Sequence, residues 1–224
     1  MLINDAAASH RIAAEDDVGH RYWTLQVDGL QCVYDARIEI WRERIDLMLL
    51  EAVPLQRIPA PVVKYLMPSR YCHPEVFFDF TAQTFGALSG GALIQAMSDW
   101  IAGNFIYDPL ATHPTTTATD SFRDRRGVCR DYAQTLIAMV RAVGIPARIV
   151  SAYAPHAEPP DFHALVEVYL DDTWHMIDPT GMSRPDEVAL IGVGRDAADI
   201  AFMTSFGLVE MKNQAVSVVE HQGN

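Results

Sequence analysis

Three residues of the chain have the types and the order that a thiol-dependent acyl-transfer site requires: Cys129, His163 and Asp178. In such a site a thiolate attacks a carbonyl carbon, an imidazole carries the proton, and a carboxylate orients the imidazole. Residue type alone does not single them out, because free cysteines are usually inert packing and the chain has eight histidines. Whether the three residues can form such a site therefore depends on the helix and strands that position their side chains.

Cys129 stands at the predicted start of a helix, directly after Gly127 and Val128. The unpaired N–H groups and the positive end of the helix dipole stabilise a thiolate at such a position. Gly144 and Pro146 end the helical pattern. The apolar positions that define its stripe are Tyr132, Ala133, Leu136, Ile137 and Val140.

The other two cysteines and the nearby basic residues are weaker signals. Cys32 falls in a predicted strand and Cys72 in a proline-rich loop, so neither has the setting of Cys129. A basic cluster close to Cys129 would favour its thiolate if the arginines face the site, although a solvated loop is the alternative. The cluster consists of Arg123, Arg125, Arg126 and Arg130.

Two predicted strands, residues 162–170 and 173–178, are joined by a two-residue turn. This turn length sets Leu165 opposite Asp178, which places Asp178 on the same face as His163 and diagonal to it. Diagonal neighbours lie about 7–8 Å apart at the backbone, within reach of an Asp–His hydrogen bond. The alternative is that Asp178 only caps the turn that follows it.

The rest of the chain predicts an α+β layout. A helical pattern follows Gly90-Gly91, a polar stretch runs from Asp108 to Arg126, and strand-like segments begin at residue 147. Residues 20–42 resemble two strands of a hairpin around Asp28-Gly29.

Residues 54–75 carry five prolines, which predicts a linker or wrapping segment rather than a regular element. We therefore predict a short β-rich N-terminal region over residues 1–65 and a main, catalytic domain over residues 66–224.

Composition limits the partners. The formal net charge of -12 argues against nucleic acid or an anionic membrane as a general partner. The N-terminus lacks the layout of a signal peptide, no apolar run is long enough to span a membrane, and the three cysteines form no disulfide framework. We expect a cytoplasmic protein with no cofactor or metal; the sequence does not indicate its oligomeric state.

The residues around the three candidates also resemble a known family. Residues 125–154, RRGVCRDYAQTLIAMVRAVGIPARIVSAYA, and residues 162–181, FHALVEVYLDDTWHMIDPTG, are similar to the bacterial and archaeal transglutaminase-like core. Cys129, His163 and Asp178 fall on the family's nucleophile, base and orienting acid. The resemblance spans roughly residues 90–181, and residues 71–90 and 190–207 also look similar to the bacterial subgroup.

The resemblance implies a papain-like fold in which a helix bearing the cysteine packs on an antiparallel sheet bearing the histidine and aspartate. Members of the family include peptidases, amidases and protein cross-linkers, so the resemblance does not fix the substrate, and we expect a peptide or protein amide. Leu165 stands where many members have tryptophan. The family's larger N-terminal β-sandwich would be shortened here, or the chain would be a fragment.

Several functions are compatible with this sequence. We favour hydrolysis of an amide through a Cys129 thioester, with amine transfer (transglutaminase activity) and a non-catalytic binding module as alternatives. The second oxyanion donor is left open among Tyr71, Trp100, Asn104 and Tyr107. The glycines of residues 189–200 imitate a dinucleotide-binding turn, but the chain leaves no room after them for further βαβ units.

Overall fold

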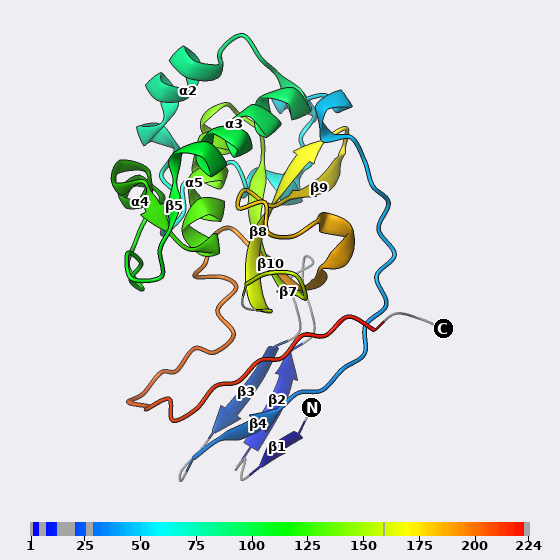
Figure 1. The fold of residues 1–224 in the computed structure, drawn as a ribbon, viewed down its shortest axis with the longest axis vertical. Helices are drawn as coiled ribbons and strands as arrows, with labels where there is room; N and C mark the ends of the chain where they lie inside the picture. Colours follow the sequence, from blue (N-terminus) through cyan, green and yellow to red (C-terminus); the bar gives the residue numbers. More distant parts are fainter. Residues whose placement is uncertain (1, 5–7, 13–20, 26–28, 159, 222–224) are drawn as a thin grey trace.

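A four-stranded antiparallel sheet and the helices that pack on it form the centre of the protein (Figure 1). The computed structural model describes residues 2–4, 8–12, 21–25, 29–158 and 160–221. The strand order in the sheet is β10-β7-β8-β9. The strands are β7 (Ala147–Ala154), β8 (Asp161–Leu170), β9 (Thr173–Ile177) and β10 (Ala189–Gly194).

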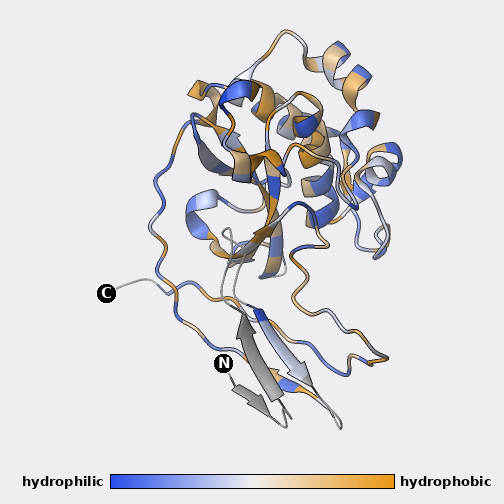
Figure 2. Cartoon of the chain, turned by 180° about the vertical axis from the view of Figure 1, so that it is seen from behind, coloured by the Kyte–Doolittle hydropathy of each residue, from blue (hydrophilic) through white to orange (hydrophobic). Residues whose placement is uncertain are grey.

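The longer helices gather on one side of this sheet (Figure 1), and Figure 2 shows hydrophobic segments both on these helices and on the strands. Five α-helices are described, α1 (Ala60–Val63), α2 (Phe78–Phe85), α3 (Gly90–Asn104), α4 (Ala118–Asp124) and α5 (Cys129–Ala142). Short 3-10 turns occur at Leu47–Leu49, Leu55–Arg57, Pro74–Val76 and Pro185–Glu187. The predicted α+β fold, with a cysteine-bearing helix on an antiparallel sheet, is confirmed.

Helix α5 is the central helix of the core. Its residues 131–141 are all buried, and Leu136, Ile137 and Val140 share one apolar cluster with Val166 and Val168 of β8. Burying each such side chain contributes about 1.5–3 kcal/mol. The opposite face of the sheet packs Leu165 in a second cluster, so the sheet is covered on both sides.

The start of α5 depends on a glycine and a buried carboxylate. Asp131 is fully buried and accepts a hydrogen bond of 2.9 Å from the backbone N–H of Val128. Gly127 has φ +155°, and a Cβ at this position would lie 2.5 Å from the Cβ of Asp131. Only glycine therefore leaves room for the cap that starts the helix at Cys129.

The hairpin of β8 and β9 has the predicted register. Leu170 pairs with Thr173, and the pairing continues to Val166 opposite Ile177. The turn residues Asp171 and Asp172 have φ of 45° and 61°, the two positive values of a type I′ turn. The two-residue turn on which the Asp178 argument depended is confirmed.

The N-terminal strands lie apart from the core (Figure 1). The described pairings join β1 (Leu2–Asn4) with β4 (Gln31–Val33) and β2 (Ala8–Ile12) with β3 (Arg21–Leu25). A pairing of β3 with β4, as the hairpin prediction required, is not among them, and Asp28 of its turn lies outside the described residues. Strand positions were predictable from apolar patterning, but the partner of each strand is set by contacts distant in sequence.

Part of the predicted N-terminal region packs on the core. Val53 and Val62 form a small buried cluster with Tyr169 of β8. The backbone N–H of Ala147, the first residue of β7, donates to the carbonyl of Tyr65 at 3.1 Å. The domain boundary near residue 65 stays a prediction.

The polar stretch between Asp108 and Arg126 is more structured than predicted. It contains α4, which starts with a capping box in which Thr117 and Asp120 bond each other's backbone N–H groups. This cap compensates for a helix with little apolar surface, which is why hydrophobic periodicity did not reveal it.

Two short strands, β5 (Ile106–Tyr107) and β6 (Arg126–Gly127), also pair in parallel at the two ends of this stretch. Within the described residues, no helix is long and apolar enough to cross a membrane.

Candidate active site

Cys129 is the first residue of α5 and is half-buried. Its position at the N-terminus of a 14-residue helix leaves its backbone N–H free of the helical hydrogen-bond ladder. Among the residues that the structure describes, the side chains of His163 and Tyr107 interact with its thiol. The thiol therefore lies between a base from the sheet and a phenol from the segment before α4.

His163 lies near the start of β8 and is 3% exposed. Its Nε2 atom is 2.8 Å from Oδ2 of Asp178, which follows β9. Because Nε2 is turned towards this carboxylate, Nδ1 is the ring nitrogen left for the thiol of Cys129. The structure thus brings the three sequence candidates into one chain of contacts.

Four hydrogen bonds hold the carboxylate of Asp178. Besides the contact with His163, Oδ2 accepts the backbone N–H of Ser183 at 2.9 Å. The Oδ1 atom accepts both the backbone N–H of Thr180 at 2.9 Å and its hydroxyl at 2.7 Å. Asp178 therefore both caps its turn and contacts the imidazole, so the two alternatives of the sequence argument coexist.

Thr180 and Ser183 were not among the residues predicted for the site. Thr180 belongs to the D-P-T-G segment, where an Asp followed by Thr two residues later is a frequent turn signature. That signature could have identified Thr180 from the sequence. Nothing local to Ser183 indicates its contact, because its N–H reaches Asp178 across a turn of five residues.

The pKa of His163 is raised from its ordinary value of 6.5 to about 9. Burial by itself lowers the pKa, but the hydrogen bond with Asp178, the hydrogen bond with Cys129 and the negative charges of both outweigh it. The imidazole therefore holds its proton at neutral pH when the thiol and the carboxylate face it. A proton held in this place can be delivered to a leaving group.

Tyr107 is the only one of the four proposed oxyanion donors for which the described residues record a contact with Cys129. Its pKa is raised to about 12 by burial and by the charge of Cys129, against a hydrogen bond from the Cys129 backbone. The phenol therefore stays protonated and can donate. The parallel pairing of Tyr107 with Gly127 brings it there.

The other three candidates are occupied elsewhere. The hydroxyl of Tyr71 donates to the carbonyl of Pro114 at 2.9 Å. Asn104 donates from its side chain to the carbonyl of Trp100 at 2.8 Å, and the ring of Trp100 stacks with aromatic neighbours and the guanidinium of Arg125. Their roles in the fold are thus structural ones.

The members of the arginine cluster contact specific partners, which are carboxylates for Arg123 and Arg126 and aromatic rings for Arg125. Arg123 pairs with Asp124 at 2.8 Å and Arg126 with Asp108 at 3.2 Å. Arg125 lies 4.1 Å from the ring centroid of Phe122, and burial lowers its pKa. The remaining member, Arg130, bonds the loop before α4.

The remaining sequence motifs are structural as well. Strand β10, which carries the imitation of a dinucleotide-binding turn, pairs antiparallel with β7 instead of opening a βαβ unit. After Gly194 the described chain continues in turns, where Asp196 accepts the backbone N–H of Tyr71 at 2.8 Å. Cys72 is fully buried, and burial raises its pKa to about 12.

Comparisons with known proteins agree with this fold. Residues 80–179 match the sequence model of the transglutaminase-like superfamily. The crystal structure of a candidate cysteine protease from Cytophaga hutchinsonii has a TM-score of 0.74 and 26% sequence identity. That alignment covers 89% of this chain and 71% of the other.

Two curated relatives match a shorter part of the chain. An uncharacterised protein of Mycobacterium leprae is 28% identical over 117 residues, 48% of this chain and 42% of that protein. A protein-glutamine gamma-glutamyltransferase of Pseudomonas aeruginosa is 30% identical over 112 residues, 42% of this chain and 17% of that protein. The chain therefore matches less than half the length of each of these two relatives.

Proposed function

Because residues 80–179 match the model of the transglutaminase-like superfamily, we propose that the chain is a thiol-dependent acyl-transfer enzyme of this type that hydrolyses a peptide or amide bond. The observation that carries the proposal is the contact of His163 with both Asp178 and Cys129. A buried imidazole between a thiol and a carboxylate is the arrangement that nucleophilic catalysis by cysteine requires.

In the first half of the reaction, the Cys129 sulfur attacks the carbonyl carbon of the amide. A C–S bond forms, and the carbonyl π electrons move to the oxygen. The backbone N–H of Cys129 and the phenol of Tyr107 donate to this oxyanion. His163 then gives its proton to the amine as the C–N bond breaks, and a thioester and a free amine result.

In the second half, the thioester is resolved. Neutral His163 takes a proton from water while the water oxygen attacks the thioester carbon. The C–S bond breaks, the sulfur leaves as a thiolate, and the carboxylic acid departs. A primary amine in place of water would give a new amide, which is the transglutaminase alternative.

We favour water as the acceptor because amine transfer needs a site that excludes water and admits a lysine, and the half-buried thiol of Cys129 offers no sign of such a site. The relative from Pseudomonas aeruginosa keeps amine transfer as the second candidate. A binding module is the third, and it has no need of a titrating imidazole between a thiol and an acid.

The test uses p-nitrophenyl acetate as the acyl donor. We expect release of p-nitrophenol and, on rapid quenching, one acetyl group on the peptide that contains Cys129. Cys129→Ala and His163→Ala should abolish both signals. A native protein that is never acetylated at Cys129 would contradict the enzyme proposal and leave the binding module.

A second measurement separates the two acceptors. Casein is incubated with the protein and a fluorescent primary amine, and the products are analysed by mass spectrometry. We expect cleaved or deamidated casein to exceed the amine-labelled product. Labelling that outruns hydrolysis would instead favour amine transfer.

A further inference from the structure

The residue that follows the nucleophile, Arg130, contacts the loop in front of α4, here called loop 108–117. Atom Nη2 of Arg130 lies 2.5 Å from Oγ1 of Thr112 and donates to the carbonyl of His113 at 2.8 Å. It also lies 3.5 Å from Oδ1 of Asp131. One guanidinium nitrogen thus joins the first turn of α5 to the middle of the loop.

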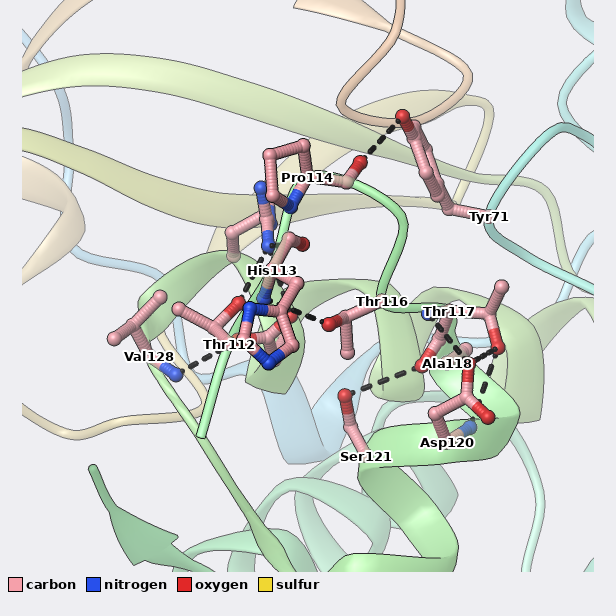
Figure 3. Close-up of polar contacts among 12 residues, drawn as sticks. Tyr71, Thr112, His113, Pro114, Thr116, Thr117, Ala118, Asp120, Ser121 and Val128 are labelled. Carbon is pink, nitrogen blue, oxygen red and sulfur yellow. Dashed lines mark hydrogen bonds and ion pairs between the residues drawn. The ribbon is translucent and has the colours of Figure 1, made fainter. Parts of the chain in front are cut away.

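The same loop is held from a second direction. Figure 3 shows the hydroxyl of Tyr71 pointing to the carbonyl of Pro114, at 2.9 Å. Within the loop, the backbone N–H of His113 donates to the hydroxyl of Thr116 at 2.8 Å. The middle of the loop therefore has a defined position without a hydrophobic core of its own.

The first part of the loop leads directly to the phenol beside Cys129. Tyr107 pairs with Gly127, and the backbone N–H of Asp108 donates to the carbonyl of Gly127 at 2.9 Å. These short strands contain only two residues each. A two-residue parallel pair is too short to be stable alone, so the loop that follows must be fixed by other contacts.

We propose that Arg130 is a positioning residue, which clamps loop 108–117 to the nucleophile helix and thereby holds Tyr107 at the oxyanion position. The proposal rests on the function proposed above. Because Cys129 and Arg130 are neighbours on one helix, the nucleophile and the loop move as a single body. Hydrogen bonds from a charged donor are roughly twice as strong as neutral ones, which suits this clamp.

The proposal separates two reactions of the same thiol. Acetylation by p-nitrophenyl acetate passes through an oxyanion, whereas alkylation by iodoacetamide does not. A misplaced oxyanion donor therefore slows the first reaction far more than the second, in which Tyr107 contacts only the thiol. A residue that acted only on the thiolate, or on the fold as a whole, would slow both reactions equally.

The experiment measures both rates in the full chain for native protein, Arg130→Ala, Arg130→Lys and Thr112→Val. We expect Arg130→Ala to lower acetylation about tenfold, since small displacements at an active site cost up to about a hundredfold. Alkylation should stay within about twofold. Arg130→Lys, which keeps the charge but not the planar fork, should recover part of the loss.

Arg123→Ala is the matched control, because it removes a neighbouring exposed arginine that bonds Asp124 and Asp120 instead of the loop. It should acetylate like the native protein. Hydrogen exchange of loop 108–117 should be faster in Arg130→Ala and Thr112→Val, while α5 keeps its protection.

Three outcomes would overturn the proposal. Equal acetylation by native protein and Arg130→Ala would refute the clamp and leave the enzyme proposal intact, as would a parallel fall of acetylation and alkylation. Absence of acetylation in the native protein would refute both. Thr112→Val removes only the acceptor hydroxyl and keeps the shape, so it tests the clamp even if Arg130→Ala fails to fold.

Discussion

Strand β8 carries two buried acid–base pairs that differ in what faces them. His163 pairs with Asp178 at 2.8 Å, and four residues further along the strand Glu167 pairs with Arg148 at 2.7 Å. The first pair contacts the thiol of Cys129, whereas the guanidinium of the second lies 4.1 Å from the ring centroid of Trp174. The base of the first pair can release its proton, and that of the second cannot.

The comparison teaches that burial and pairing do not by themselves indicate chemistry. Both pairs are buried, and both link β8 to a neighbouring strand or its extension. Only the pair with a titratable base and a nucleophile in contact has a use in proton transfer. The other one joins two strands in the sheet.

The largest expected difference concerns activity. His163→Ala should lower acetylation by p-nitrophenyl acetate by about 10⁴-fold or more, as for other triads, because the thiol then loses the base that takes its proton. Glu167→Gln should leave the rate within about threefold. Burst kinetics on both variants measure this, and a similar loss in both would erase the distinction between the pairs.

For stability, the two pairs should rank in the opposite order from activity. Glu167→Ala leaves the Arg148 charge buried without its carboxylate, and we expect it to lower the free energy of unfolding by about 3–5 kcal/mol. Asp178→Ala should cost less, about 1–3 kcal/mol, because His163 can lose its charge when its acceptor is removed. Urea unfolding at about pH 7.5 compares them. A larger loss for Asp178→Ala would contradict this account.

A substitution of Tyr107 also separates the two pairs, because this residue lies beside the His163–Asp178 pair and not beside the Glu167–Arg148 pair. Tyr107→Phe keeps the ring and removes the donor, and we expect acetylation to fall about a hundredfold. Alkylation of Cys129 should fall far less, since it forms no oxyanion and loses only the contact of the phenol with the thiol. Trp174→Phe, at the other pair, serves as the control. An acetylation rate like that of the native protein would remove Tyr107 from the mechanism.

The smallest expected effect is the dependence of stability on pH. The pKa of His163 is about 9 in the folded protein and 6.5 ordinarily, so its proton stabilises the fold fully below about pH 6.5. This contribution, at most about 3 kcal/mol, is lost as the pH rises to about 9. The free energies of unfolding of the native protein and of His163→Gln, measured as a function of pH, should converge over this range. Parallel curves would show that the pKa is not raised.

Much of the fold and of the candidate site was predictable from local sequence. The helix after Cys129 has an apolar stripe with clear stop signals, and the two-residue turn determines the register that brings Asp178 near His163. Both features arise from residues close in sequence.

The parts that were not predicted depend on contacts between distant segments. The two-residue strand that brings Tyr107 to Gly127 is too short to leave a pattern, so the sequence could not single out Tyr107 among the four candidates. The pairing of β3 with β2 and the partners of the arginines are likewise set by the fold. Helix α4 was missed because a cap, rather than an apolar face, defines it.

The order of residues at the start of α5 determines which parts of the protein must be transferred with the catalytic residues to another scaffold. Consecutive helical residues are rotated by about 100°, so Cys129, Arg130 and Asp131 point in three directions. One contacts the imidazole, the next the loop, and the third the helix's own cap. Grafting only the cysteine, histidine and aspartate of the triad onto another scaffold would omit the contact of Arg130 with the loop and the Asp131 cap at Val128. A transplant that keeps function must therefore carry the loop and Gly127 with the helix.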